Sequence, residues 1–133
     1  MAITFNHLNL LTTKNSDAIH LLTEVLGLTD GSRPRFPFKG QWLYQGDEAL
    51  IHIIESDVPQ CSMGHVAFDT DMSLEVLTQK LRRSGIKHNI RQVPDSNVIQ
   101  VFVRAGEVVF ELITLDTSSQ HNFDVFSQHQ ELT

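Results

Sequence analysis

The chain has 133 residues, 41% of them hydrophobic, and a net charge of −6 with a pI near 5.5. This length suffices for one globular domain with a core, and the acidity argues against nucleic acid or a membrane surface as a partner. The single cysteine, Cys61, excludes an internal disulfide framework and fits a reducing compartment. We see no signal peptide and no run of 18 apolar residues, so we expect a cytoplasmic protein with no membrane partner.

The first half of the chain predicts a strand, a helix and then further strands. Residues 3–11 alternate between two faces, which is typical of a strand. Asn15 or Ser16 offers an N-cap for a helix that Gly27 ends. Residues 29–40 contain two prolines and predict a loop or a poorly formed edge strand. Two more strands, residues 42–44 and 50–54, are expected on either side of a turn at Gly46 and Asp47. The helix carries an apolar stripe at helical spacing: Ala18, Leu21, Leu22, Val25 and Leu26.

The second half predicts the same order of elements. Residues 63–69 predict a strand, and Asp71 or Ser73 caps a helix that ends at Gly85. Further strands are expected over residues 88–93, 98–104 and 107–115. We therefore expect a single α+β domain over residues 1–133, with module one at about 1–58, module two at about 59–115 and a C-terminal extension at 116–133.

The two halves repeat their polar residues as well as their elements. His7 matches His65 at an offset of 58, and His52 matches Glu111 at an offset of 59. Strand alternation places all four side chains on the faces away from the predicted helices. Two such sheets facing one another would form a cup with these side chains inside.

These four residues predict a divalent metal site. A lone histidine on an apolar strand is more often a core residue than a ligand, but a buried carboxylate needs a cation or dense hydrogen bonding. The coincidence across the repeat favours the metal. Imidazoles with one carboxylate suit zinc, nickel, cobalt, iron(II) or manganese. If all four bind, a zinc ion is nearly enclosed; if His52 stands off, the other three form the two-histidine, one-carboxylate arrangement of non-haem iron oxygenases.

Five further residues are candidates for substrate binding. Arg33 and Arg104 carry charges that would hold an anionic substrate, although arginines on loops and hairpin ends are usually solvated. Trp42, Tyr44 and Phe102 either line the pocket or fill the core. The sequence leaves both alternatives open.

The repeated module, the histidine on the first strand of each half, and Phe110, Glu111 and Leu112 on the last strand resemble the vicinal oxygen chelate superfamily. This group includes glyoxalase I, fosfomycin-resistance thiol transferases, extradiol dioxygenases, methylmalonyl-CoA epimerase and metal-free bleomycin-binding proteins. The resemblance covers roughly residues 3–115. It implies paired βαβββ modules, an incomplete, glyoxalase-like barrel around a metal, and commonly a homodimer.

The resemblance also implies roles for the site residues. His7, His65 and Glu111 fall where the common ligands of the family fall, and His52 falls where glyoxalase I carries a glutamate. The usual Asp-Pro-Asp-Gly turn before the last strand is replaced by a shorter turn at residues 104–107.

We therefore expect a metal-dependent enzyme whose small substrate chelates the metal through vicinal oxygens, most readily a glyoxalase-type lyase or isomerase. Glu111 would be a ligand and proton shuttle, and His52 a ligand or general base. The alternatives are an iron-dependent dioxygenase, a thiol transferase, or a non-catalytic protein that binds a small molecule such as an antibiotic.

Overall fold

The computed structural model describes residues 2–57 and 60–116. Its first half contains β1 (Ile3–Thr12), α1 (Asp17–His20), the π-helical segment η1 (Leu21–Val25), β2 (Thr29–Gly31), β3 (Gly40–Gln45) and β4 (Glu48–Glu55). Its second half contains β5 (Ser62–Thr70), α2 (Leu74–Arg83), β6 (Asn89–Gln92), β7 (Val98–Ala105) and β8 (Val108–Leu115). Each half is thus a βαβββ module, as the sequence predicts.

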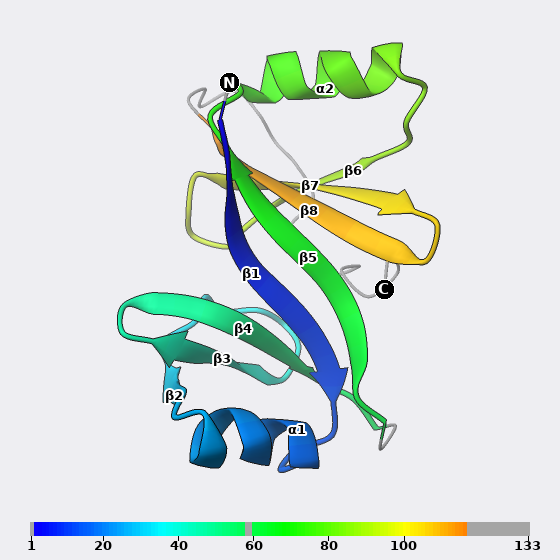
Figure 1. Ribbon diagram of the computed structural model, residues 1–133. Coiled ribbons are helices and arrows are strands. Elements are labelled where there is room, and N and C mark those ends of the chain that lie inside the picture. Colours follow the sequence, from blue (N-terminus) through cyan, green and yellow to red (C-terminus); the bar gives the residue numbers. More distant parts are fainter. Residues whose placement is uncertain (1, 58–59, 117–133) are drawn as a thin grey trace.

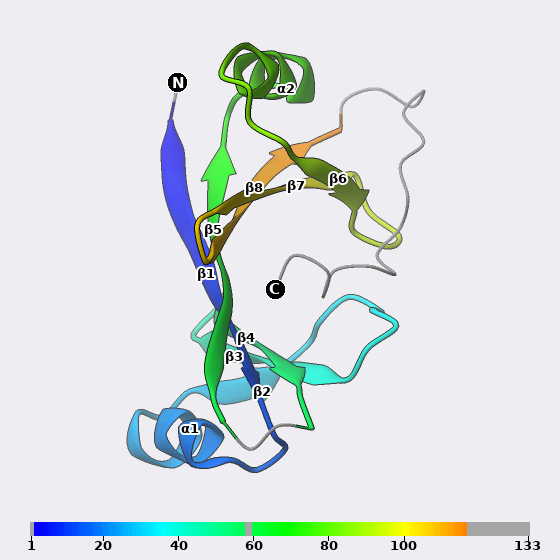
Figure 2. The same ribbon diagram turned by 90° about the vertical axis from the view of Figure 1, so that its right-hand side faces the viewer.

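The eight strands of the described residues belong to one sheet with the order β2-β3-β4-β1-β5-β8-β7-β6 (Figure 1). Within the modules β1 runs parallel to β4 and β5 parallel to β8, and the modules join where β1 and β5 pair antiparallel. The sheet curves so that its two ends face each other, and α1 and α2 lie on the outside (Figure 2). This open, curled sheet is the incomplete barrel that the family resemblance implies.

Matching start and stop signals define the helical segment of each module. The Ser16 hydroxyl accepts a hydrogen bond from the Ile19 backbone N–H, and the Ser73 hydroxyl accepts one from Val76. After each helix the chain passes through a glycine in the left-handed region, Gly27 at φ 79° and Gly85 at φ 68°. The sequence repeat therefore includes the residues that cap the helical segment at both ends in each module.

The predicted apolar stripe on the first helix is wrong in part. Leu21, Val25 and Leu26 are 50%, 67% and 62% exposed, whereas Leu22 packs against the sheet beside Ile19, which the stripe did not include. The α-helix lasts four residues before it widens into the π-helical η1, so side chains that a continuous α-helix would align on one face are rotated away from it.

Strand alternation decides which side chains reach the concave side of the sheet. On the outer face, α2 packs on a cluster from β7, and α1 packs on Leu43 and Ile53. The side chains that face inward include His7 on β1, His52 on β4, His65 on β5 and Glu111 on β8, and all four are at most 8% exposed. No helix within the described ranges has the length and apolarity needed to cross a membrane.

Candidate metal centre

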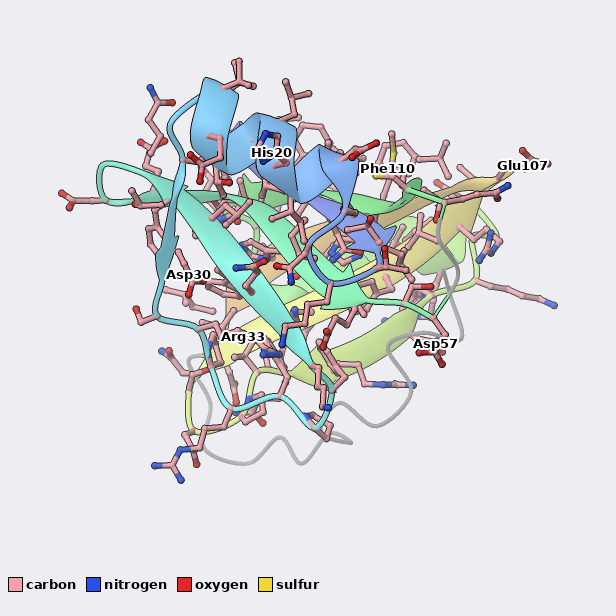
Figure 3. All side chains as sticks on the ribbon, turned by 90° about the horizontal axis from the view of Figure 1, so that it is seen from below. His20, Asp30, Arg33, Asp57, Glu107 and Phe110 are labelled. Carbon is pink, nitrogen blue, oxygen red and sulfur yellow. The ribbon has the colours of Figure 1, made fainter. Side chains whose placement is uncertain are left out.

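The concave side of the sheet encloses a cavity of about 980 Å³ lined by both modules. The four predicted ligands line this cavity, and so do three of the five predicted substrate-binding residues, Arg33, Trp42 and Tyr44. Figure 3 shows Arg33 and His20 on opposite sides of the first module's part of the sheet, with His20 on the outer helix. A cavity of this size accommodates a small molecule next to the polar cluster.

Three ligand atoms converge at the base of the cavity, from β1, β5 and β8. His65 Nε2 lies 2.7 Å from Glu111 Oε1 and 3.2 Å from His7 Nε2, and His7 Nε2 lies 3.3 Å from Glu111 Oε1. Neighbouring ligands of an ion with bonds near 2.1 Å are spaced about 3.0 Å apart in octahedral geometry and about 3.4 Å in tetrahedral geometry. The triangle formed by these three atoms therefore fits a first-row divalent ion.

The side chain of Asn6 fixes the ring of His7. Asn6 Nδ2 donates to Asp69 Oδ2 at 2.8 Å, which leaves Asn6 Oδ1 to accept from His7 Nδ1 at 2.6 Å. In neutral His7, Nδ1 therefore carries the proton, and Nε2 turns a lone pair toward His65 and Glu111. A lone pair facing a carboxylate is unfavourable unless a cation lies between them, so the donor set suits a metal.

Glu111 is 1% exposed, and a buried amide orients it. Gln100 Nε2 donates to Glu111 Oε2 at 2.6 Å, which turns the other oxygen, Oε1, toward the two histidines. Burial alone would raise the pKa of the Glu111 carboxyl. The charges that His7 and His65 carry when protonated, together with their hydrogen bonds, outweigh burial and hold this pKa well below its usual value. Glu111 is therefore an anion at neutral pH, as a metal ligand must be.

His52 lies in the cavity but outside the group of three. Its ring stacks on that of His7 with centroids 3.5 Å apart, and its other face stacks on Trp42 at 3.7 Å. We expected His52 as a fourth ligand, yet the described group of converging ligand atoms comprises His7, His65 and Glu111. Burial, followed by the charge of protonated His7, lowers the pKa of His52 to about 2, so this imidazole is neutral and a weak base.

The arginines predicted to bind substrate are placed differently from each other. Arg33 donates to the backbone carbonyl of Phe38 at 2.8 Å, and its guanidinium carbon lies 5.4 Å and 5.5 Å from the ring centroids of Phe36 and Phe38. It thus braces its own loop at the mouth of the cavity. Arg104 is exposed near the end of β7 and is not among the residues that line the cavity.

Phe102 lies beneath the site and does not line it. It is 1% exposed and meets the ring of His65 edge-on at a centroid distance of 5.6 Å. Its other neighbours include Val109 and the rings of Phe36 and Phe38. Of the two alternatives that the sequence left open, Phe102 fills the core and does not border the cavity.

No protein-family model matches the sequence, and no curated protein matches it either. Among solved structures, the chain is similar to a methylmalonyl-CoA epimerase from Mycobacterium tuberculosis, with 17% identity and a TM-score of 0.61 over 82% of this chain and 85% of that one. A hypothetical protein from Bacillus halodurans C-125 gives 16% identity and a TM-score of 0.68 over 91% and 100% of the two chains.

A 2,3-dioxygenase from Pseudomonas sp. KL28 gives 17% identity and a TM-score of 0.64 over 94% of this chain but only 46% of the dioxygenase. The chain shares the fold of these structures, an open, curled sheet of the glyoxalase-like α+β type. The fold that the sequence resemblance implied is thus confirmed. The chain spans most of the epimerase but less than half of the dioxygenase, and at these identities the likeness establishes the fold alone.

Proposed function

We propose that the protein is a metal-dependent enzyme whose small substrate chelates the ion through two adjacent oxygens. The observation that carries this proposal is the convergence of His7 Nε2, His65 Nε2 and Glu111 Oε1, with mutual distances between 2.7 and 3.3 Å, at the base of a cavity of about 980 Å³. These residues would hold zinc, nickel, cobalt, iron(II) or manganese. The bound ion would supply Lewis-acid chemistry and, as iron(II), oxygen-activating chemistry.

The residues of the chain have distinct parts in such a reaction. Asn6 and Gln100 would orient the ligands, and Arg33, Trp42 and Tyr44 would border the substrate. Glu111 Oε1 is the carboxylate oxygen nearest the ion site and would bind the ion as an anion, and its lowered pKa makes it a poor proton carrier at neutral pH. A general base at His52 fits less well, because an imidazole with a pKa of about 2 accepts a proton from substrate poorly at neutral pH.

Two reaction classes have a specific observation in their favour. The stacked His52 leaves a two-histidine, one-carboxylate set with open positions, which favours iron(II)-dependent ring-cleaving oxygenation. The glyoxalase-type lyase or isomerase is favoured by the structural similarity to the methylmalonyl-CoA epimerase, which covers 85% of the epimerase chain. Because His52 lies outside the group of three converging ligand atoms, we favour the oxygenase of these two classes.

Turnover of the metal-loaded protein tests the choice. We expect the iron(II)-loaded protein to consume oxygen with catechols, and the zinc- or nickel-loaded protein to leave hemithioacetals of oxo-aldehydes unchanged. The opposite pattern would support the lyase or isomerase. If the metal-free protein binds a small molecule fully and turns over neither catechols, hemithioacetals nor thiol adducts, the result would support the binding-protein alternative. The lack of turnover of thiol adducts would also exclude the thiol transferase.

We also propose a cytoplasmic homodimer. The support is the sequence resemblance, which implies a homodimer, together with the exposed apolar side chains Leu21, Val25 and Leu26 of the first helical segment. Sedimentation at micromolar concentration should show a species of twice the mass of the chain. A strict monomer would exclude the dimer and leave the metal site unaffected, because all three proposed ligands come from one chain.

A further inference from the structure

Three aromatic rings form a continuous stack on the wall of the cavity. The indole of Trp42 lies 3.7 Å from the ring of His52 at an interplanar angle of 12°, and His52 lies 3.5 Å from His7 at 15°. Trp42 and His52 are direct partners across β3 and β4. His52 is thus held between a side chain that cannot bind a metal and one of the proposed ligands.

The equivalent residues Glu111 and His52 are oriented differently in the two modules. Glu111 on β8 corresponds to His52 on β4, and their cross-strand partners are Phe102 and Trp42. Gln100 donates to the outer oxygen of Glu111 and turns the inner oxygen into the site. The position equivalent to Gln100 is Gly40, opposite Ile54 as Gln100 is opposite Ile113, and it has no side chain to turn His52 inward.

The stack keeps the nitrogens of His52 from converging with the other ligand atoms. The lone pair of an imidazole nitrogen lies in the plane of its ring. In two rings that are stacked 3.5 Å apart and nearly parallel, such lone pairs run side by side and do not meet at one point. His52 would have to tilt out of the stack to join His7, and the indole of Trp42 occupies the space on its outer face.

We propose that Trp42 is a positioning residue that keeps His52 out of the coordination sphere, so that the metal has three protein ligands and an open face for substrate. This inference rests on the proposed metal-dependent function. Trp42 thereby sets the coordination number of the site, and the metal preference and reaction class follow from that number.

Cobalt(II) alone is the probe, because its visible absorption and its X-ray absorption report geometry and the number of bound imidazoles without turnover. We expect the wild-type protein to bind cobalt(II) through two imidazoles with the weak visible bands of an open site. His52→Ala should keep this spectrum. Trp42→Ala should add a third imidazole and strengthen the bands, and Trp42→Ala combined with His52→Ala should restore the wild-type spectrum.

Two further variants guard against a change in folding. Trp42→Phe keeps an aromatic ring on His52 and should keep the wild-type spectrum even if removal of the ring by Trp42→Ala prevents folding. In that case Trp42→Leu, which keeps apolar volume without the flat face, takes the place of Trp42→Ala. Phe38→Leu removes a ring from the same cavity that stacks on Phe36 and not on His52, so it should leave the spectrum unchanged.

A third imidazole in the wild-type spectrum that disappears in His52→Ala would overturn the inference, because His52 would then be a ligand. Two imidazoles in both Trp42→Ala and Trp42→Leu would overturn it as well. Either result leaves the metal-dependent function standing. A wild-type protein that binds no cobalt(II) would instead remove the metal site, and the proposed function and this inference would fall together.

Discussion

The low pKa of His52 predicts a measurable pH dependence of stability in the metal-free protein. Burial lowers the pKa of His52 from 6.5 to about 2. Because folding lowers this pKa, His52 binds a proton in the unfolded chain but stays neutral in the folded chain at pH values between about 2 and 6.5. The contribution of His52 to stability is therefore complete above pH 6.5 and is lost as the pH falls toward 2.

The size of the effect follows from linkage. Between pH 7 and pH 5 the unfolded chain gains the proton almost completely and the folded chain does not, so His52 alone removes about 2 kcal/mol of stability. For a domain of this size, 1 kcal/mol shifts the Tm by about 3–5 °C, so the loss amounts to roughly 6–10 °C. The depressed pKa of Glu111 acts in a lower window, below its ordinary value of 4.5, and adds little here.

Thermal unfolding followed by circular dichroism in the presence of a chelator measures this loss. The control is His52→Phe, which keeps a ring between Trp42 and His7 but does not titrate. We expect the Tm of the wild-type protein to fall between pH 7 and pH 5 by roughly 6–10 °C more than that of His52→Phe. Equal losses in the two proteins would show that the folded state accepts the proton and that His52 is not the buried neutral ring described here.

Three further substitutions test the surroundings of the site. Glu111→Gln keeps the shape of the side chain but removes its charge, and isothermal titration with zinc should show a metal affinity lower by more than about 100-fold; an unchanged affinity would exclude Glu111 as a ligand. Gln100→Leu frees Glu111 to rotate and should lower zinc affinity by about 10–100-fold in the same titration, whereas a purely structural role would lower the Tm alone. Gly64→Ala should destabilise the protein by about 1–3 kcal/mol in urea unfolding, because its Cβ would overlap Asn9 Oδ1; a neutral result would show that Asn9 can move aside.

The sequence predicts the fold well because the information is local and repeated. Ser16 and Ser73 mark helix starts, Gly27 and Gly85 mark their ends, and strand alternation assigns inner and outer faces. Strand alternation and the offset of 58 residues also predict that His7 and His65 face the same cavity, where the structure places their Nε2 atoms 3.2 Å apart. The π-helical segment was not predictable from the stripe, since its residues also suit an α-helix.

What the sequence does not predict depends on distances between side chains. Strand alternation correctly places His52 on the inner face of the sheet. Whether its ring points at His7 or stacks on it depends on Trp42, for which the sequence left open a place at the substrate or in the core. The sequence does not predict the hydrogen bonds by which Asn6 and Gln100 orient His7 and Glu111. Gln100 leaves a signal, since an amide in the middle of the apolar run at residues 98–103 must find a buried partner.

The metal content of protein purified without chelators tests the central claim most directly. We predict about one equivalent of a divalent first-row metal in the wild-type protein. His20→Ala, at an exposed histidine on the outer helix, should retain that metal, and His65→Ala and Glu111→Gln should lose it. A wild-type protein without metal that also fails to take it up on titration, or a Glu111→Gln protein that keeps its full equivalent, would contradict the account.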